Sequence, residues 1–240
     1  MSGSEVRAGR GLGSALIGGL IGSAVTAGLL VLAGPQLFGE RMVREALLAN
    51  PQILVETADA LRDRQYAPTL AANRAAIETP FANSWKGAAK PEVVLVEFHD
   101  YACTYCRASN PHIERLLKED GGLRVVYRDL PILGPNSVAA ARLALAASKA
   151  GRFHQFHDAL YAAGRPSPEA LAAAAQAAGI PAEPPASQEI EAELKKNFEL
   201  AGRLGATGTP LFVVGDRVMN SAVGYDALKQ AVADARARKG

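Results

Sequence analysis

The stretch V-V-L-V-E-F-H-D-Y-A-C-T-Y-C, from Val93 to Cys106, decides the fold. Its first six residues, 93–98, form a short β-branched apolar run that is typical of a buried strand. The run leads directly to Cys103 and Cys106, and apolar residues then recur at helical spacing as far as Lys118. We therefore expect a strand that delivers the chain to a helix whose first turn carries a Cys-x-x-Cys pair.

The next segments predict a parallel strand and a helical block. A second β-branched run at residues 123–127 follows the glycines at 121–122, so strand, helix and strand form a βαβ unit with a right-handed crossover. Residues 136–205 are rich in alanine, helical in pattern and interrupted by glycine and proline. This segment predicts a block of four short helices.

The C-terminal part predicts a hairpin and a closing helix. Apolar runs at residues 211–214 and 217–219 flank Gly215-Asp216, which is a hairpin signal, and residues 225–235 have helical spacing. The fold class is therefore α/β, with an all-helical insertion between a βαβ half and a ββα half.

The N-terminal segment predicts a membrane helix. Residues 11–39 carry no charge, and residues 12–34 alone would form a helix of about 35 Å, enough to cross a hydrocarbon core roughly 30 Å thick. Arg7 and Arg10 precede the run, which favours a cytoplasmic N-terminus and export of the remaining chain. We expect a retained anchor, with a cleaved signal peptide as the alternative.

A helical arm is expected between the anchor and the α/β domain. Residues 40–49 predict a short amphipathic helix that stops at Asn50-Pro51, and a second helix runs to about Ile77 with a break or kink near Pro68. The arm has no evident core of its own. It either packs back on the domain or pairs with the same arm of another subunit. The expected organisation is 1–39 cytoplasmic tip and anchor, 40–80 arm, and 81–240 α/β domain with its insertion at about 136–205.

The net charge and the number of cysteines limit the classes of function that the sequence supports. The net charge of +2 over 240 residues, without a basic domain, gives no indication of a nucleic-acid partner. The chain has two cysteines, both in the Cys-x-x-Cys pair, so neither is left over for a structural disulfide elsewhere.

Cys103 and Cys106 predict thiol–disulfide exchange. The first cysteine falls at a helix N-terminus, where free N–H groups and the helix dipole stabilise a thiolate. Cys103 would then form a mixed disulfide with a client protein, and Cys106 would resolve it. Half of a zinc site is the alternative, but zinc needs four ligands and only His154 and His157 are paired. We expect no metal and no cofactor.

Two further positions are candidates for the same site. Glu97 lies near the end of the first strand, where a buried carboxylate would exchange a proton with Cys106; an exposed strand-end glutamate is the alternative. Thr209-Pro210 precedes the 211–214 strand, and a cis bond there would turn the backbone of Thr209 toward the cysteines. An ordinary trans proline in a turn is the alternative.

Three motifs together resemble the DsbA-like branch of the thioredoxin superfamily. They are V-E-F-x-D-Y-x-C-x-x-C at 96–106, Y-R-D-L-P-I-L-G-P at 127–135 and G-T-P-L-F-V-V-G-D at 208–216, and the resemblance covers roughly residues 91–235. It implies a thioredoxin fold with a helical insertion. It also implies Cys103 as nucleophile, Cys106 as resolving thiol, Glu97 as buried acid and Pro210 as a cis-proline after Thr209.

The resemblance also implies partners and a location. Such proteins act outside the cytoplasm on folding or misfolded proteins and are recycled by a membrane redox partner, of DsbB-like or DsbD-like type. The arm looks like the N-terminal helices of ScsC-like and Com1-like members, some of which oligomerise, so a homo-oligomer through residues 40–78 is expected. We expect a single-pass protein of a bacterial inner membrane with its catalytic domain in the periplasm, or a soluble periplasmic protein if the leader is cleaved.

The residues between the cysteines depart from the family pattern. The best-known oxidases carry Pro-His there, whereas this chain has Thr104-Tyr105 and no ionisable base between the cysteines. The resemblance therefore predicts an extracytoplasmic protein disulfide oxidoreductase that is a weaker oxidant. The alternatives are a disulfide isomerase or reductase of the oligomeric ScsC-like type, or a membrane-tethered chaperone that binds clients without redox chemistry.

Overall fold

The computed structural model describes residues 39–183 and 186–238, and the chain divides into two compact units, 1–60 and 61–240. The described part of the first unit is helical, with one helix over residues 39–49 and the start of α2 (Gln52–Glu78). Helix α2 is continuous across Pro68. Both predicted arm helices are therefore present, and the expected break near Pro68 is absent from α2.

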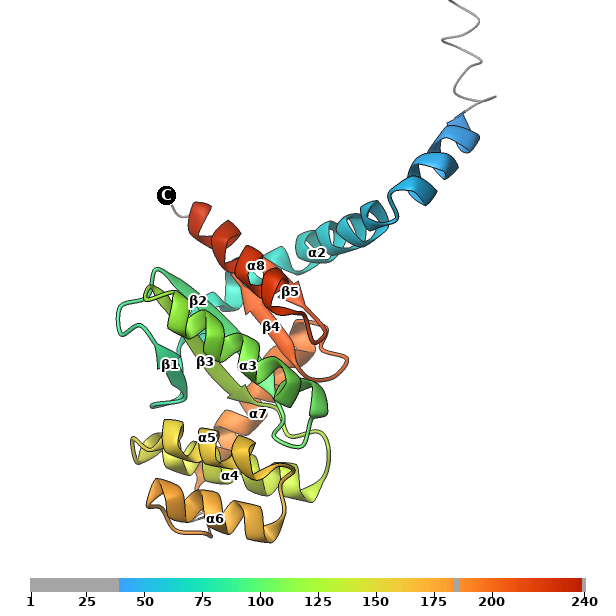
Figure 1. The fold of residues 1–240 in the computed structure, drawn as a ribbon. Helices are drawn as coiled ribbons and strands as arrows, with labels where there is room; N and C mark the ends of the chain where they lie inside the picture. Colours follow the sequence, from blue (N-terminus) through green and yellow to red (C-terminus); the bar gives the residue numbers. More distant parts are fainter. Residues whose placement is uncertain (1–38, 184–185, 239–240) are drawn as a thin grey trace, which may run out of the picture. The chain divides into compact units, whose positions relative to one another are not determined.

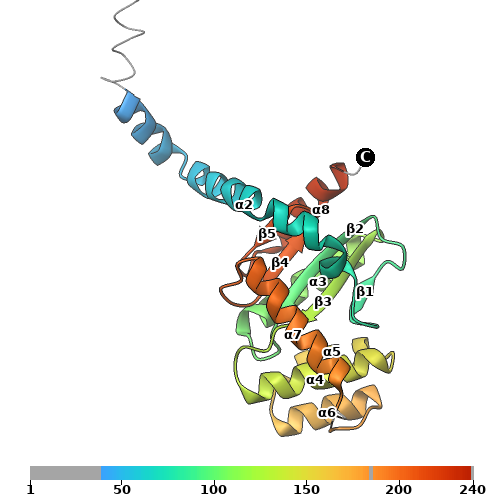
Figure 2. The ribbon, with the colours of Figure 1, turned by 180° about the vertical axis from the view of Figure 1, so that it is seen from behind.

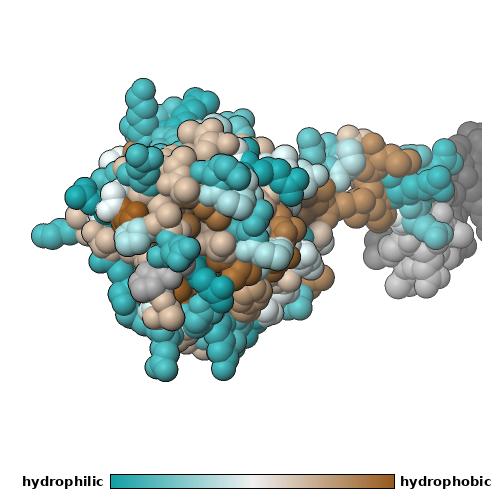
Figure 3. Space-filling model, turned by 90° about the horizontal axis from the view of Figure 1, so that it is seen from below, coloured by the Kyte–Doolittle hydropathy of each residue, from teal (hydrophilic) through white to brown (hydrophobic). Residues whose placement is uncertain are grey.

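The predicted membrane helix, residues 11–39, lies outside the described residues except for Gly39. Within the described part of the chain, no helix combines the length and apolar character needed to cross a membrane. The described arm does expose large apolar side chains, which appear as brown atoms in Figure 3. They are Met42, Val43, Leu48, Ile53, Leu54 and Val55.

A five-stranded mixed sheet forms the centre of the second unit (Figure 1). Its order is β1-β3-β2-β4-β5, and β2 and β3 are the parallel pair. The other neighbours pair antiparallel. The strands are β1 (Trp85–Gly87), β2 (Val93–His99), β3 (Leu123–Asp129), β4 (Leu211–Val214) and β5 (Arg217–Met219).

The expected βαβ and ββα halves are both present. Helix α3 (Thr104–Glu119) connects β2 to β3, and the β4–β5 hairpin leads to α8 (Tyr225–Ala237). Strand β1 was not predicted, because three residues of sequence W-K-G carry no readable periodicity. It pairs with the outer edge of β3.

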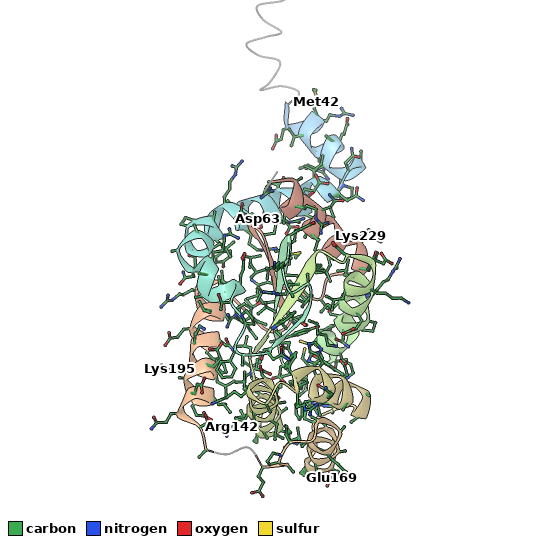
Figure 4. The ribbon with its side chains drawn as sticks, turned by 90° about the vertical axis from the view of Figure 1, so that its left-hand side faces the viewer. Met42, Asp63, Arg142, Glu169, Lys195 and Lys229 are labelled. Atoms are coloured by element: carbon green, nitrogen blue, oxygen red, sulfur yellow. The ribbon has the colours of Figure 1, made fainter. Side chains whose placement is uncertain are left out.

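Helices cover both faces of the sheet. Alternate residues of β2, such as Leu95, pack with α3 and α8 on one face, because successive strand residues point to opposite sides. Val96 and Phe98 face the other side, where they pack with Leu70 of α2 and Leu200 of α7 (Gln188–Arg203). Figure 2 shows α7 and the end of α2 on that side, and Figure 4 shows Lys195 of α7 and Lys229 of α8 on the two outer surfaces.

Arg128 joins the end of α2 to the sheet and to α7. Its side chain is 1% exposed, and it donates to the carbonyl oxygens of Ile77 at 2.8 Å and Thr79 at 2.6 Å. It also pairs with Glu193 at 2.8 Å and donates to Asn197 at 2.9 Å. These bonds satisfy carbonyls that the C-terminus of a helix leaves free. Residues 61–78 of the arm are therefore part of the second unit.

The insertion between the two halves forms a separate helical layer. Helices α4 (Pro135–Lys149), α5 (Phe153–Ala163) and α6 (Pro168–Ala178) share an apolar core that includes Leu143, Phe156 and Leu160. Together with α7, they are the four helices that the sequence predicted for residues 136–205, within the part of that segment that is described. The layer packs beside the carboxyl ends of β2 and β3, where α3 also begins (Figure 1).

Candidate active site

Cys103 is the N-cap residue of α3, in extended conformation with φ −76° and ψ 121°. The strand β2 ends at His99, so only three residues separate it from Cys103. Cys106 lies within the first turn of the helix and is fully buried, while Cys103 is 6% exposed. The local sequence thus places the first cysteine at the helix terminus and the second behind it, as predicted from their spacing.

Asp100 fixes the loop that carries the cysteines. Its carboxylate accepts from the backbone N–H of Ala102 at 2.8 Å, and also from Ile132 at 2.8 Å and Leu133 at 2.9 Å. Its carbonyl oxygen accepts from the Cys103 N–H at 2.9 Å. Asp100 therefore ties the loop after β2 to the loop after β3. The sequence interpretation did not single it out, although it belongs to the D-Y pair of the 96–106 motif.

The two thiols differ strongly in proton affinity. The pKa of Cys103 is lowered to about 5, chiefly because the Cys106 side chain hydrogen-bonds to it; the side chain of Thr209 and the backbone of Tyr105 and Cys106 also lower it. The pKa of Cys106 is raised far above its ordinary value by burial, by its hydrogen bond to Cys103 and by the nearby charge of Glu97. Cys103 is therefore a thiolate at neutral pH, and Cys106 is a thiol.

Thr209-Pro210 lies directly beside Cys103. The peptide bond between them is cis, and the carbonyl oxygen of Thr209 accepts a hydrogen bond from the Cys103 Sγ at 3.2 Å when that sulfur carries its proton. The residues are 106 positions apart in sequence, and the pairing of β2 with β4 brings them together. The segment thus occupies the position that the sequence analysis expected.

Glu97 is buried beneath the cysteines. Only 1% of the residue is exposed, and its register partner on β3 is Tyr127. Burial, with a smaller contribution from the charge of Cys103, raises the pKa of Glu97 to about 8. Its Oε1 has no hydrogen-bond partner among the described residues. The alternative of an exposed strand-end glutamate is therefore wrong.

The paired histidines of the insertion do not face a common point. His154 Nε2 lies 2.6 Å from the carbonyl oxygen of Trp85, whereas His157 Nδ1 lies 3.0 Å from the hydroxyl of Tyr101. Across the described residues, no cluster of three or more histidine, cysteine, aspartate or glutamate side chains is arranged to hold a metal ion. Cys103 and Cys106 are both free cysteines.

Exposed apolar side chains lie between the cysteines and in the loop that Asp100 ties to them. Tyr105, between the two cysteines, is 67% exposed, and Ile132 and Leu133 in the loop after β3 are 44% and 50% exposed. A hollow of about 240 Å³ lies next to Thr209 and is lined by Leu130, Ile132, Phe198, Ala201, Thr207 and Gly208. Phe198 adds a side chain that is 43% exposed. The site therefore combines a reactive sulfur with apolar contacts of the kind that an unfolded polypeptide offers.

Comparison with known proteins agrees with this geometry. Residues 94–233 match the family described as DSBA-like thioredoxin domain, and residues 40–67 match the family described as the N-terminal domain of the copper resistance protein ScsC. A thioredoxin-like oxidoreductase from Silicibacter pomeroyi is 36% identical, with a TM-score of 0.63 over 70% of this chain and 99% of that one. A periplasmic thioredoxin-like protein from Salmonella enterica is 30% identical, with a TM-score of 0.63 over 68% and 95% of the two chains.

A longer relative also matches part of this chain. An Na⁺/H⁺ antiporter NhaA from Salinispora arenicola is 30% identical over 157 residues, which is 62% of this chain. The match spans only 24% of the antiporter's length. The DSBA-like match, by contrast, covers more than half of the chain and includes β2, α3 and β4 with their two cysteines and Thr209-Pro210. The chain therefore belongs to the family of DsbA-like thioredoxin domains, whose members are thiol–disulfide oxidoreductases.

Proposed function

We propose that the protein is an oxidoreductase that forms or exchanges disulfides in client proteins through Cys103 and Cys106. The observation that carries this proposal is the contrast between the two thiols at the start of α3. The pKa of Cys103 is about 5 because Cys106 hydrogen-bonds to it, whereas burial raises the pKa of Cys106. A thiolate nucleophile beside a protected thiol is the arrangement that two-step disulfide exchange requires.

The exchange proceeds by two displacements when the protein transfers its disulfide to a client. A client thiolate attacks Cys103 and forms a mixed disulfide, and Cys106 leaves as a thiolate that takes a proton from Glu97. A second thiolate of the same client then attacks the client's sulfur in the mixed disulfide, and Cys103 leaves as a stable thiolate. The client loses two electrons and becomes disulfide-bonded, and the protein gains them as a dithiol. The low pKa of Cys103 favours this direction, because a stable thiolate leaves readily.

Glu97 and Thr209-Pro210 have distinct roles in this proposal. Glu97 exchanges a proton with Cys106, because it is buried with it and has a pKa of about 8 as a result of burial. Thr209 presents its backbone to an extended client segment beside Cys103, supported by the 3.2 Å contact between its carbonyl oxygen and the sulfur. The apolar surface of Tyr105, Ile132 and Phe198 would contact the client's side chains.

We further propose the location and assembly that the family suggests. The uncharged run at 11–39 would anchor the chain in the inner membrane, with residues 81–240 in the periplasm and a DsbB-like or DsbD-like partner restoring the redox state. The match of residues 40–67 to the ScsC N-terminal domain and the exposed apolar residues of the arm support a homo-oligomer through residues 40–78. The mass of the full chain in detergent tests the oligomer, and a monomeric mass would contradict it.

The same arm supports a second candidate, a disulfide isomerase or reductase of the oligomeric ScsC-like type. The two directions leave different redox states in the cell. An oxidase is kept mostly as the Cys103–Cys106 disulfide, and an isomerase or reductase is kept mostly as the dithiol. Trapping thiols with acid and an alkylating reagent in intact cells distinguishes the two directions.

The proposed activity is tested with the full chain in detergent. The oxidised protein is mixed with a reduced peptide that contains two cysteines, and both products are weighed by mass spectrometry after acid quenching. We expect the peptide to lose two hydrogens while the protein gains two, with one protein consumed per peptide oxidised. A peptide that stays reduced at the rate of a buffer control would contradict an oxidoreductase role and favour the client-binding alternative.

A further inference from the structure

Four polar side chains form a buried block on the two central strands. Glu97 and His99 alternate on β2, so both face the same side of the sheet. Their register partners on β3 are Tyr127 and Asp129. All four residues are 1% exposed or less, on the face that α3 covers. The carboxylate beneath the cysteines is therefore one corner of a larger polar cluster.

Tyr161 and His157 of the insertion and Tyr101 of the active-site loop close over this block and form two tyrosine–histidine pairs with it and with each other. The hydroxyl of Tyr161 on α5 lies 3.3 Å from His99 Nδ1, and the hydroxyl of Tyr101 lies 3.0 Å from His157 Nδ1. The two tyrosine rings are 5.2 Å apart and the two histidine rings 5.7 Å apart, measured between centroids. The sequence interpretation missed these pairs, because their members are 62 and 56 residues apart.

Several atoms in this cluster lack the partners that a purely structural core would supply. Among the described residues, Glu97 Oε1, His99 Nε2, the Tyr127 hydroxyl and both oxygens of Asp129 make no hydrogen bond. His99 Nε2 stands 3.6 Å from Asp129 Oδ1, beyond hydrogen-bond distance. Buried polar atoms without partners cost about 1–3 kcal/mol each, so packing alone does not account for the cluster.

Tyr161 differs from the other three residues because it keeps some exposed surface. It is 9% exposed, whereas Tyr101, His99 and His157 are 1% exposed or less. Tyr161 lines a hollow of about 440 Å³ together with Arg107, Asn110, Glu114 and Asp158. Arg107 holds it there by donating to the Tyr161 carbonyl oxygen at 2.5 Å, with its guanidinium 5.4 Å from the ring centroid.

Tyr161 also contacts the strand that carries the buried acid, because its hydroxyl lies 3.3 Å from Nδ1 of His99, two residues beyond Glu97 on the same face of β2. Besides burial, the charges of Glu97 and Cys106 are the largest contributions that raise the pKa of Tyr161. For Tyr101, Asp129 and Tyr127 contribute more than Glu97 does. Tyr161 therefore joins the polar face of β2 to the hollow that it lines.

The proposed reaction needs such a connection. When Cys106 attacks a mixed disulfide on Cys103, its proton passes to Glu97, and both residues are almost completely buried. The proton must leave before the next turnover. We infer that Tyr161, held by its hydrogen bond to His99, is a positioning residue that connects Glu97 to the solvent in the hollow and so sets the rate of the proton transfer by Cys106. The inference rests on the proposed function.

Other ionisable groups face this route from each neighbouring element. They are Cys103 and Cys106 at the start of α3, Arg107 and Glu114 farther along α3, Tyr127 and Asp129 on β3, Asp100 and Tyr101 before α3, His157 and Asp158 on α5, and Lys86 on β1, which pairs with Glu114 and Asp158. None of the tyrosines or histidines among them combines contact with the hollow and a hydrogen bond to His99, within the described residues.

The test follows one mixed disulfide through its formation and decay. Reduced full chain is mixed with glutathione disulfide, quenched in acid and weighed. Cys103 attacks the probe and releases one glutathione thiolate; Cys106 then gives its proton to Glu97, attacks Cys103 and releases the second. The protein loses two electrons and the probe gains them. Formation reports the proposed function, and decay reports the inference.

Tyr161→Phe is compared with Tyr101→Phe, which removes the other histidine-bonded hydroxyl from the same cluster. We expect Tyr161→Phe to form the adduct at the normal rate and to slow its decay at least about tenfold, a typical loss for impaired proton transfer. The pH midpoint of the decay should rise, because a buried carboxylate loses a polar neighbour. Tyr101→Phe should change neither the decay rate nor its pH midpoint. In a Glu97→Gln background, Tyr161→Phe should have no further effect, because it acts through Glu97.

Three results would overturn the inference while leaving the proposed function intact. They are decay at the wild-type rate in Tyr161→Phe, equal slowing in both tyrosine variants, and an undiminished effect of Tyr161→Phe in the Glu97→Gln background. Failure of Cys103 to form the adduct in the wild type would instead contradict the proposed function. Hydrogen exchange of β2 and α5 amides checks that each variant is folded.

Discussion

The Cys106→Ser variant is expected to accumulate as a mixed disulfide with client proteins, attached through Cys103. Cys103 is 6% exposed, and its pKa is about 5, chiefly because of the Cys106 side chain; Thr209 and the Tyr105 backbone, which also lower this pKa, remain in the variant, so Cys103 stays a competent nucleophile. Without Cys106, no internal thiol resolves the adduct. Intramolecular attack by a well-placed group is equivalent to a very high reagent concentration, so its loss should lengthen the adduct's lifetime at least about a hundredfold.

The adducts are measured by non-reducing electrophoresis and peptide mapping of bacteria that express the full chain. The Cys103→Ser variant is the matched control, because it removes the nucleophile and keeps Cys106, whose thiol is buried and has a raised pKa because of that burial. Cys103→Ser should give no adducts and no disulfide transfer. Equal adduct levels in the two variants, or adducts mapped to Cys106, would contradict the assignment of roles.

Glu97→Gln is expected to stabilise the reduced protein by about 3 kcal/mol at pH 7. Burial raises the pKa of Glu97 to about 8 in the folded state, from 4.5 in the unfolded chain. Between these values the unfolded chain is ionised while the folded protein holds the proton, so stability falls as pH rises through this window. Each pH unit between 4.5 and 7 lowers the free energy of unfolding by about 1.36 kcal/mol, which gives the stated value at pH 7. Glutamine cannot ionise and removes this dependence.

Chemical denaturation of the reduced full chain at several pH values measures this effect. The wild type and Glu97→Gln should differ little near pH 4 and diverge up to about pH 8. Glu199→Gln, an exposed change on α7, is the control and should follow the wild type. Parallel stability curves for wild type and Glu97→Gln would show that Glu97 ionises normally in the folded state. Such a gain at a site needed for activity is the usual trade-off between stability and function.

Most of the fold is predictable from local patterns. Five of the seven residues of β2 are apolar, and α3, α8 and the insertion helices have clear helical spacing, so their predicted bounds differ from the observed ones by only a few residues. Strand β1 escaped prediction because it is three residues long and is defined by its pairing with β3. Of the break or kink expected near Pro68, the break is absent, because α2 continues across this residue.

The candidate site likewise contains residues that the sequence predicts and residues that it does not. Cys103 and Cys106 are recognisable from sequence because their spacing and their place at a helix start are local features. The burial of Glu97 stayed open, since alternation along β2 does not reveal which layers cover each face of the strand. Tyr161 was missed, and His157 was considered only as a zinc ligand, because α5 meets β2 only through the packing of the insertion. Local sequence therefore predicts the nucleophile, and tertiary packing determines its proton exchange.

The pH dependence of cysteine alkylation tests the central claim most directly. Reduced full chain is treated with iodoacetamide across a range of pH, and each modified cysteine is identified by peptide mapping. The structure predicts a midpoint near pH 5 for Cys103, because the Cys106 side chain stabilises its thiolate, and no modification of buried Cys106. Modification of both cysteines with a shared midpoint near the ordinary thiol value, about 8.5, would contradict it.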